Sequence, residues 1–378
     1  MNPIVSEVAR RGSVSFSEFM GLALYHPTAG YYTRARRGGG PVGPEGDFVT
    51  APTASNLFAR TVARLLDQLA QELGEPLTLA ELGAGEGALL RRLVPECGGI
   101  GGETLARVVA VEASERARKR LVATCPGVES GDTLVGFALP SGPTVLLASE
   151  LYDAVPARRA TLRRRDGVLE MAEYHVAVAP GGRLAWRLAA PADGAVEKYL
   201  AVRGLQLEEG QIVEIRPGLE AMHAEHLAWC GRSALAVIIE YGYPARQLFN
   251  PRARRLGTLV GTFRHRIVAN PLSRPGQVDL TAHVNFDDLD GAAARLGWER
   301  AQIKPLGSFL ALHGALGMLP QPVAEGARLS AADWAELSAA KRLLHPSGMG
   351  GDLKALVQGR GAAWSAYEKV ATPPPTEA

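Results

Sequence analysis

The chain has 378 residues, of which 47% are hydrophobic and 21% charged, the composition of a folded protein with one large domain or two ordinary ones. Its 41 basic and 39 acidic residues leave a net charge of only +2, so charge gives no case for nucleic acid or an anionic membrane as a partner. The 3 cysteines are spaced for neither a disulfide framework nor a metal site, and no apolar run reaches the roughly 18–20 residues of a membrane span. Because the N-terminus also lacks the apolar core of a secretion signal, we expect a soluble, cytoplasmic protein without a bound metal.

The first part of the chain combines two predicted helices with an irregular segment between them. Residues 14–25 have a helical pattern, with Ser15 as the N-cap and Glu18 as its capping-box partner. The stretch 34–52, RARRGGGPVGPEGDFVTAP, is too rich in glycine and proline for regular structure. It is either disordered or held in place by something that it binds. Residues 55–73 space their apolar side chains at helical intervals and predict the second helix.

Strands and helices then alternate along the chain. Apolar runs without polar alternation, which are typical of buried parallel strands, occur at 77–82, 107–114, 143–151 and 234–242. Helical patterns follow the first two of these runs, at 87–94 and 115–123. This alternation predicts an α/β fold with a mostly parallel sheet covered by helices on both faces.

Two stretches interrupt the alternation. Residues 157–190 hold an Asp-Gly and a Gly-Gly pair between alternating segments, which predicts β-hairpins and hence an antiparallel insertion. Residues 243–281 are rich in Pro, Gly and Arg and are predicted to be irregular. Near the end, 331–344 is predicted as a helix and 352–358 as a strand, of the kind that closes an open sheet at its edge.

A glycine loop follows the first buried strand, in the sequence TLAELGAGEGAL. Gly83, Gly85 and Gly87 stand at every second position after that strand. Ligands of open α/β sheets bind at the carboxyl ends of the strands, and glycine lets the backbone approach them closely. A dinucleotide, S-adenosylmethionine (SAM) and a purely structural turn are all compatible with the glycines alone.

The acidic residues around the loop favour SAM. Glu81 lies two residues before the first glycine and Glu86 lies within the loop, where a carboxylate would disfavour the pyrophosphate of a dinucleotide. SAM has no phosphate, and the ammonium group of its methionine part would suit a nearby carboxylate. Glu112 ends the next strand, where it can accept hydrogen bonds from both ribose hydroxyls. That interpretation of Glu112 supports an adenosine cofactor without choosing between NAD and SAM.

Five motifs in order carry a resemblance to a known family. They are LYHPTAGYY (24–32), GDFVTAP (46–52), ELGAGEGALL (81–90), ELYDAVP (150–156) and DLTAHVNF (279–286). Together they resemble the MidA-like family of class I SAM-dependent methyltransferases, over roughly residues 14–360. That family includes the mitochondrial arginine methyltransferase that assists assembly of respiratory complex I. The glycine loop is unspecific, whereas no general requirement of a fold produces the first two motifs.

The resemblance implies a Rossmann-like SAM domain with an N-terminal cap and inserted elements. It also implies that GDFVTAP folds over the cofactor and that Asp132 lies near the adenine. Two departures from the family pattern lie on the expected acceptor side: Ser149 replaces an Asn and Glu240 replaces an Asp. They leave acceptor specificity open. The candidate cofactor-binding residues are therefore Asp47, Phe48, Thr50, Glu81, Gly83, Gly85, Gly87, Glu112 and Asp132.

The candidate catalytic residues are Glu150 and Asp153, at the end of the fourth strand. Two carboxylates could hold a guanidinium group by bidentate contacts and take up its proton. The alternative is structural, with Glu150 paired locally and Asp153 stabilising the turn before Pro156. His283 is a weaker candidate for a base and also fits a structural role. The arginines at 158–165 are either a solvated face or a binding surface.

These features predict a SAM-dependent methyltransferase, and the resemblance makes a protein arginine side chain the expected acceptor. The alternatives are a non-catalytic assembly or scaffold factor that keeps the fold, and an NAD-dependent oxidoreductase. A protein substrate is expected as partner, and the apolar cap is compatible with a homodimer. The expected parts are a cap with a cofactor-covering loop (1–54), the first half of the core (55–156), a β-hairpin insertion (157–210), the second half of the core with substrate-side elements (211–365) and a flexible tail (366–378).

Overall fold

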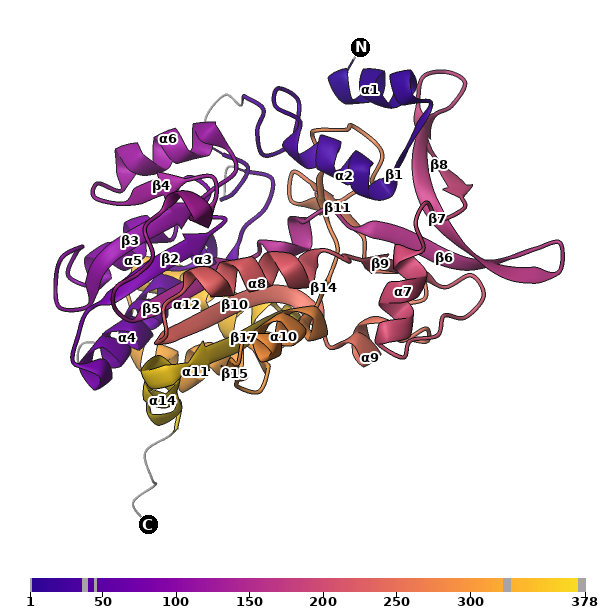
Figure 1. Cartoon of the computed structure of the whole chain (residues 1–378). Helices are drawn as coiled ribbons and strands as arrows, with labels where there is room; N and C mark the ends of the chain where they lie inside the picture. The colour runs from indigo at the N-terminus through magenta and orange to yellow at the C-terminus, as the bar shows by residue number, and fades with distance from the viewer. Residues whose placement is uncertain (1, 36–39, 44–45, 322–327, 373–378) are drawn as a thin grey trace.

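The computed structural model describes residues 2–35, 40–43, 46–321 and 328–372. A nine-stranded sheet forms the centre of the fold, and a smaller antiparallel sheet lies to its right in Figure 1. The strand order in the central sheet is β15-β17-β10-β5-β2-β3-β4, with β14 beside β10 and β16 beside β17. Its strands are β2 (Leu77–Leu82), β3 (Leu105–Val111), β4 (Glu129–Gly131), β5 (Thr144–Ser149), β10 (Ala234–Tyr243), β14 (Val284–Asn285), β15 (Glu299–Arg300), β16 (Lys304–Pro305) and β17 (Leu353–Arg360).

The neighbouring strands from β4 to β10 are parallel, so the predicted α/β class is confirmed. The strand expected to close the sheet at its edge is β17, which runs antiparallel to β10. It is not the edge, because β15 and β16 pair along its outer side. Each of these two strands has only 2 residues, too few to show a periodic pattern in the sequence.

Helices cover both faces of the central sheet. Successive residues of β10 show the two layers, since Val237 packs in the cluster with Phe58 of α4 and Ile238 packs in the cluster with Leu289 of α10. The helices and short 3-10 turns of the core are α3 (Ala51–Ala54), α4 (Asn56–Leu73), α5 (Leu90–Glu96), α6 (Glu115–Thr124), η1 (Leu134–Gly136), η2 (Tyr152–Ala154), α8 (Leu219–Trp229), α10 (Phe286–Arg295), α11 (Leu306–Leu312), η3 (Ala315–Met318), α12 (Ala331–Leu344), α13 (Met349–Asp352) and α14 (Gly361–Val370).

The antiparallel insertion is confirmed as a separate sheet with the order β1-β7-β6-β9 and with β8 beside β7. The hairpin of β6 and β7 projects from the molecule at the right of Figure 1. The elements of this part are β1 (Ser13–Ser15), β6 (Arg158–Arg165), β7 (Val168–Val178), β8 (Leu184–Ala189), α7 (Ala195–Val202) and β9 (Ile212–Ile215).

The N-terminal cap packs against this second sheet. Helix α1 (Pro3–Arg11) was not predicted, whereas α2 (Phe16–Tyr25) begins as expected, since Ser15 and Glu18 form both hydrogen bonds of the capping box. The rings of Phe16 and Trp186 lie 5.3 Å apart, which joins α2 to β8. The cap therefore fixes the antiparallel sheet beside the core.

Residues 243–281 are more ordered than predicted. They contain the short helix α9 (Ala245–Leu248) and a three-stranded sheet of β11 (Val260–Phe263), β12 (Arg266–Ile267) and β13 (Asp279–Thr281). Helix α14 extends to Val370, so it includes the first residues of the expected tail, and 373–378 lie outside the described residues. None of the helices described is long and apolar enough to cross a membrane.

Candidate functional site

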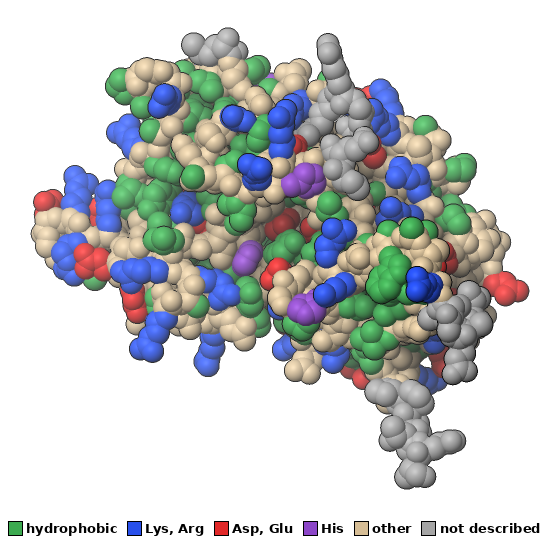
Figure 2. All heavy atoms as spheres, turned by 180° about the vertical axis from the view of Figure 1, so that it is seen from behind, with side chains coloured by type: hydrophobic (Ala, Val, Ile, Leu, Met, Phe, Trp, Pro, Cys, Tyr) green, Lys and Arg blue, Asp and Glu red, His purple; other side chains and the backbone are tan. Residues whose placement is uncertain are grey.

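A cavity of about 1050 Å³ opens at the carboxyl ends of β2, β3 and β5. This volume is at the upper end of the range for small-molecule sites. Seen from behind, acidic side chains lie deep in a hollow near the middle of the molecule, bordered by basic and histidine side chains (Figure 2). Eight predicted site residues line the cavity: Phe48, Thr50, Glu81, Gly83, Gly85, Glu112, Asp132 and Glu150.

The glycine loop presents its backbone to this cavity. Gly83 and Gly85 have φ angles of 69° and 56°, a region that side chains with a Cβ rarely adopt. A Cβ at Gly83 would lie only 3.0 Å from Leu151 Cδ1, whereas the space beside Gly85 is open. Helix α5 begins at Leu90, later than predicted, because the turns around these glycines occupy the preceding residues.

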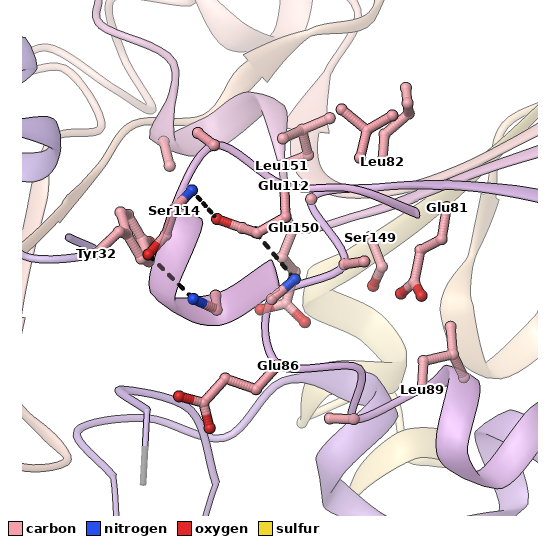
Figure 3. A pocket seen from close by; sticks show the side chains of 18 of the residues that line it. Tyr32, Glu81, Leu82, Glu86, Leu89, Glu112, Ser114, Ser149, Glu150 and Leu151 are labelled. Carbon is pink, nitrogen blue, oxygen red and sulfur yellow. Dashed lines mark hydrogen bonds between the residues drawn. The ribbon is translucent and has the colours of Figure 1, made fainter. Parts of the chain in front are cut away.

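Glu112 is fixed at the centre of the site by two backbone groups (Figure 3). Its Oε2 accepts the N–H of Gly85 at 2.9 Å, and its Oε1 accepts the N–H of Ser114 at 2.8 Å. Burial raises the pKa of this carboxyl group. Each carboxylate oxygen has a further lone pair, so Glu112 can still accept hydrogen bonds from two hydroxyl groups.

Glu81 is a buried acid with an orphaned oxygen. Its Oε2 has no hydrogen-bond partner in the described part of the chain, and the residue is only 5% exposed. Burial, together with the negative charge of Glu112, raises the pKa of Glu81 to about 8. A cation beside Glu81 would satisfy this oxygen and favour the ionised form. The ammonium group of SAM meets that requirement, and the open glycine loop and Glu112 suit its adenosine, so the residues present fit SAM.

Glu86 was expected to disfavour a pyrophosphate in the glycine loop, and in the structure it makes contacts that hold the loop in place. Its Oε1 pairs with Nη1 of Arg120 at 2.8 Å, and its Oε2 accepts the N–H of Gly40 at 3.2 Å. Glu86 therefore ties the glycine loop to the segment that precedes GDFVTAP. Part of the Gly/Pro-rich stretch, 36–39 and 44–45, lies outside the described residues.

Asp47 and Gly87 do not line the cavity. Asp47 accepts a hydrogen bond from the hydroxyl of Tyr31 at 3.0 Å and another from the N–H of Arg264 at 3.1 Å, so it anchors the GDFVTAP segment from behind. Gly87 faces α6, where an added Cβ would lie 2.9 Å from Cys125 Sγ. In the structure Asp47 therefore makes hydrogen bonds outside the cavity and Gly87 packs against α6, and their contact with the cofactor stays a prediction.

Glu150 reaches the cavity in an unusual backbone conformation. Its φ angle is 53°, and it is not a glycine. Its Oε1 accepts the N–H of Ala51 at 2.9 Å. Burial, with the charges of Asp153 and Asp279, raises the pKa of Glu150 to about 8. A strained, buried carboxylate in a cavity is characteristic of a functional group.

Asp153 is close enough to Glu150 for its charge to raise the pKa of Glu150, but it does not line the cavity, so a clamp of two carboxylates stays a prediction. Asp153 is buried, and its negative charge faces Arg216. Ser149, one of the two departures from the family pattern, does line the cavity, and its hydroxyl has no hydrogen-bond partner among the described residues.

Two tyrosines from the LYHPTAGYY motif form another part of the cavity wall. The rings of Tyr25 and Tyr32 are stacked, with centroids 5.6 Å apart. The hydroxyl of Tyr32 donates to Asp279 Oδ1 at 2.9 Å, and that of Tyr25 donates to the carbonyl of Ala154 at 3.1 Å. Aromatic faces attract cations, so this wall suits a positively charged acceptor.

Helix α8 contributes lining residues that the sequence analysis missed. Met222, His226 and Trp229 project into the wall at spacings of four and three residues. This helical spacing was the signal in the sequence that could have identified the three residues. His226 Nδ1 lies 3.0 Å from the hydroxyl of Tyr152, and burial lowers the pKa of His226 to about 4.

The remaining candidates lie elsewhere. His283 is outside the cavity lining, and burial lowers its pKa to about 4. Within the ranges that the structure describes, its Nδ1 has no hydrogen-bond partner. The arginines of β6 are largely paired, for example Arg158 with Glu173 and Arg163 with Glu170. Within the described part of the chain, no group of three or more His, Cys, Asp or Glu side chains could hold a metal ion.

Comparisons with known proteins agree with SAM as the cofactor of this site. A family model described as "Putative S-adenosyl-L-methionine-dependent methyltransferase" matches residues 57–304. "Protein arginine methyltransferase NDUFAF7, mitochondrial" of Danio rerio is 27% identical over 321 residues, or 76% of this chain and 70% of that one. Its Drosophila melanogaster homolog is 26% identical over 311 residues, or 74% and 67%. A Burkholderia thailandensis protein crystallised with S-adenosyl-homocysteine has a TM-score of 0.78 and 28% identity, covering 96% of this chain and 94% of that one.

The comparisons also correct one expectation. The sequence led us to expect a cytoplasmic protein, but these curated relatives are named as mitochondrial proteins. The absence of a secretion signal does not exclude import into mitochondria, so it did not justify the cytoplasmic assignment.

Proposed function

Because this chain belongs to a family of S-adenosyl-L-methionine-dependent methyltransferases, we propose that it methylates an arginine side chain of a protein partner. The observation that carries the proposal is Glu150, a buried carboxyl group that reaches the same cavity as the glycine loop and Glu112. The names of the curated relatives support a protein arginine as the acceptor. The large cavity volume leaves room for an acceptor side chain beside the cofactor.

The first half of the cavity would hold SAM. Gly83 and Gly85 allow the cofactor to approach the backbone, and Glu112 would accept the ribose hydroxyls. Glu81 would face the ammonium group, and Asp132 lies at the cavity wall where the adenine is expected. When bound, SAM supplies a methyl carbon that its sulfonium already activates for attack. The protein's contribution is therefore to position the acceptor and manage its proton.

Glu150 would bind the guanidinium group on the acceptor side. The Ala51 N–H holds one of its oxygens in place, which limits the orientations of the carboxylate. An incoming positive charge favours the ionised form of Glu150, although burial keeps it protonated in the free protein at neutral pH. Once ionised, Glu150 can accept the proton that the guanidinium nitrogen must lose. The stacked rings of Tyr25 and Tyr32 would offer a face to the planar cation.

A transfer assay on peptides tests the proposal. The protein is incubated with SAM labelled in its methyl group and with two peptide libraries that differ only in a central arginine or lysine. The proposal predicts label on arginine, located by fragment mass spectrometry, and at least about a hundredfold slower labelling with Glu150→Gln. If label were found on lysine alone, the acceptor would be lysine and not arginine. Normal SAM binding without any transfer to peptides or to intact arginine-rich proteins would favour the scaffold alternative.

A further inference from the structure

Arg216 holds four backbone carbonyl groups with one buried guanidinium. Its Nε donates to the carbonyl of Val155 at 2.8 Å, and its Nη2 donates to those of Asp153 at 2.7 Å and Ala282 at 2.8 Å. Its Nη1 donates to the carbonyl of His283 at 3.0 Å. The residue is only 4% exposed, so these bonds are made in a dry interior, where leaving carbonyl groups without partners is costly.

These four carbonyls belong to two segments that are far apart in the sequence. The first is the acceptor loop, residues 150–156, which carries Glu150 into the cavity. The second is residues 279–285, which carry Asp279, the partner of Tyr32. A direct bond from the Ala282 N–H to the Asp153 carbonyl, at 3.1 Å, lies beside the guanidinium and joins the same segments.

Arg216 also connects these segments to the rest of the molecule. It directly follows β9 of the antiparallel sheet, and α8 begins three residues later. Helix α8 returns to the acceptor loop through His226, which lies 3.0 Å from the hydroxyl of Tyr152. The side chain of Arg216 therefore lies where the antiparallel sheet, the acceptor loop and the 279–285 segment meet.

The charge of Arg216 is balanced by an acid of the same region. Asp153 interacts favourably with it, and the charge of Arg216 opposes the burial that raises the pKa of Asp153 to about 6. A buried arginine with well-formed hydrogen bonds to carbonyls and nearby carboxylates is tolerated, whereas loss of either partner leaves an uncompensated charge. Lysine could not replace it, because an ammonium group cannot reach four carbonyls in this planar arrangement.

We propose that Arg216 is a positioning residue for the acceptor: its guanidinium fixes the acceptor loop against the 279–285 segment, so that Glu150 and Tyr32 face the acceptor from two sides. This assignment rests on the proposed function. It adds a residue that touches neither the cavity nor the reacting groups.

Two variants and one control separate positioning from simple stability. Arg216→Lys keeps the charge but loses the fork of donors, and Arg216→Gln is the second variant where the lysine does not fold. Arg203→Lys is the matched control, because Arg203 is also largely buried and pairs with Asp288 at 2.6 Å, away from the acceptor loop. SAM titration by calorimetry gives the fraction of competent protein in each sample, and kcat for the arginine peptide is divided by that fraction.

The expected result is a corrected kcat lowered about a hundredfold in Arg216→Lys, since small misplacements of reacting groups have effects of that size. SAM affinity stays within about twofold of the original, because the cofactor half of the cavity is untouched. A corrected kcat equal to that of Arg203→Lys would overturn the proposal and leave Arg216 with a structural role only.

Amide hydrogen exchange provides a readout that does not depend on turnover. Faster exchange confined to residues 150–156 and 279–284 is expected in the Arg216 variants and not in Arg203→Lys. Asn285 is left out of the comparison because its side chain bonds Asp288, the partner of Arg203. If the original protein methylates no arginine, the proposed function fails, and exchange still decides whether Arg216 holds the two segments. Unchanged exchange in both segments would overturn the proposal in either case.

Discussion

The carboxyl group of Glu240 holds the backbone of Leu151: its Oε1 accepts the Leu151 N–H at 2.7 Å, and it accepts the next N–H, of Tyr152, at 2.5 Å. Glu240 lies near the end of β10, so this strand supports the acceptor loop through its side chain. Its Oε2 has no hydrogen-bond partner among the residues that the structure describes, and burial raises the pKa of Glu240 well above its usual value. This direction favours the protonated, neutral form of the side chain.

This relationship predicts opposite outcomes for two conservative substitutions. Glu240→Gln keeps an accepting oxygen and no net charge, so kcat/KM for the arginine peptide should stay within about threefold. Glu240→Asp is one methylene shorter and loses both bonds, which should lower kcat/KM at least tenfold, as the loss of about 1.5 kcal/mol implies. Steady-state transfer assays on both variants decide the matter. Equal impairment of the two would mean that an ionised Glu240 is required.

Binding of SAM should release a proton from Glu81. The pKa of Glu81 is raised to about 8 in the free protein, so the group is protonated near neutral pH. A cation next to it lowers that pKa, and the proton leaves as the complex forms. At about pH 6.5, the apparent enthalpy of binding should therefore differ between buffers with small and large ionisation enthalpies. The difference should vanish in Glu81→Gln. Identical enthalpies in both buffers for the original protein would refute this role.

Glu150→Gln should separate transfer from cofactor binding. The amide cannot accept the acceptor's proton, so the transfer rate should fall about 10²- to 10⁴-fold, the usual contribution of a general base. SAM affinity should stay close to that of the original protein, because Glu150 lies on the acceptor side of the cavity. Single-turnover transfer and SAM titration on the same sample measure both. A variant that turns over at the original rate would exclude Glu150 from catalysis.

Two buried histidines should respond oppositely to replacement by leucine. His313 is 2% exposed in the apolar core, and neither ring nitrogen has a hydrogen-bond partner among the residues described. His313→Leu should therefore stabilise the protein by about 1–2 kcal/mol. His223 bonds the hydroxyl of Tyr152 at 2.9 Å and Gln358 Oε1 at 2.8 Å. His223→Leu removes this hydrogen-bond partner from both groups and should lower the free energy of unfolding by about 2 kcal/mol. Urea unfolding of the three proteins tests the contrast, and a destabilised His313→Leu would contradict it.

Much of the fold could be predicted because buried parallel strands leave unbroken apolar runs. The runs at 77–82 and 143–151 became β2 and β5, and the Asp-Gly pair at 166–167 marked the hairpin between β6 and β7. The cofactor side was also accessible to sequence reasoning, since the glycine loop and the acid after β3 follow local rules of α/β sheets. The site roles, the domain boundaries and a homodimer stay predictions.

The acceptor side was harder to predict because its contacts join distant parts of the chain. Arg216 bonds carbonyls that are 61 to 67 positions away, and nothing in the local sequence VEIRPG marks them. Gly87 follows the same spacing as Gly83 and Gly85, yet the packing of α6 turns it away from the cavity. Glu240 stood out only as a departure from a family pattern, and its bonds to the acceptor loop depend on the pairing of β10 with β5.

The most direct test of the SAM site is a calorimetric titration with SAM of three proteins: the original chain, Glu112→Ala and Glu150→Gln. Saturable binding to the original chain and to Glu150→Gln is expected. Binding to Glu112→Ala should be at least about a hundredfold weaker, because the two hydrogen bonds from the ribose hydroxyls to the carboxylate are lost. Equal affinity in Glu112→Ala, or no binding by the folded original chain, would contradict the assignment of this cavity to SAM.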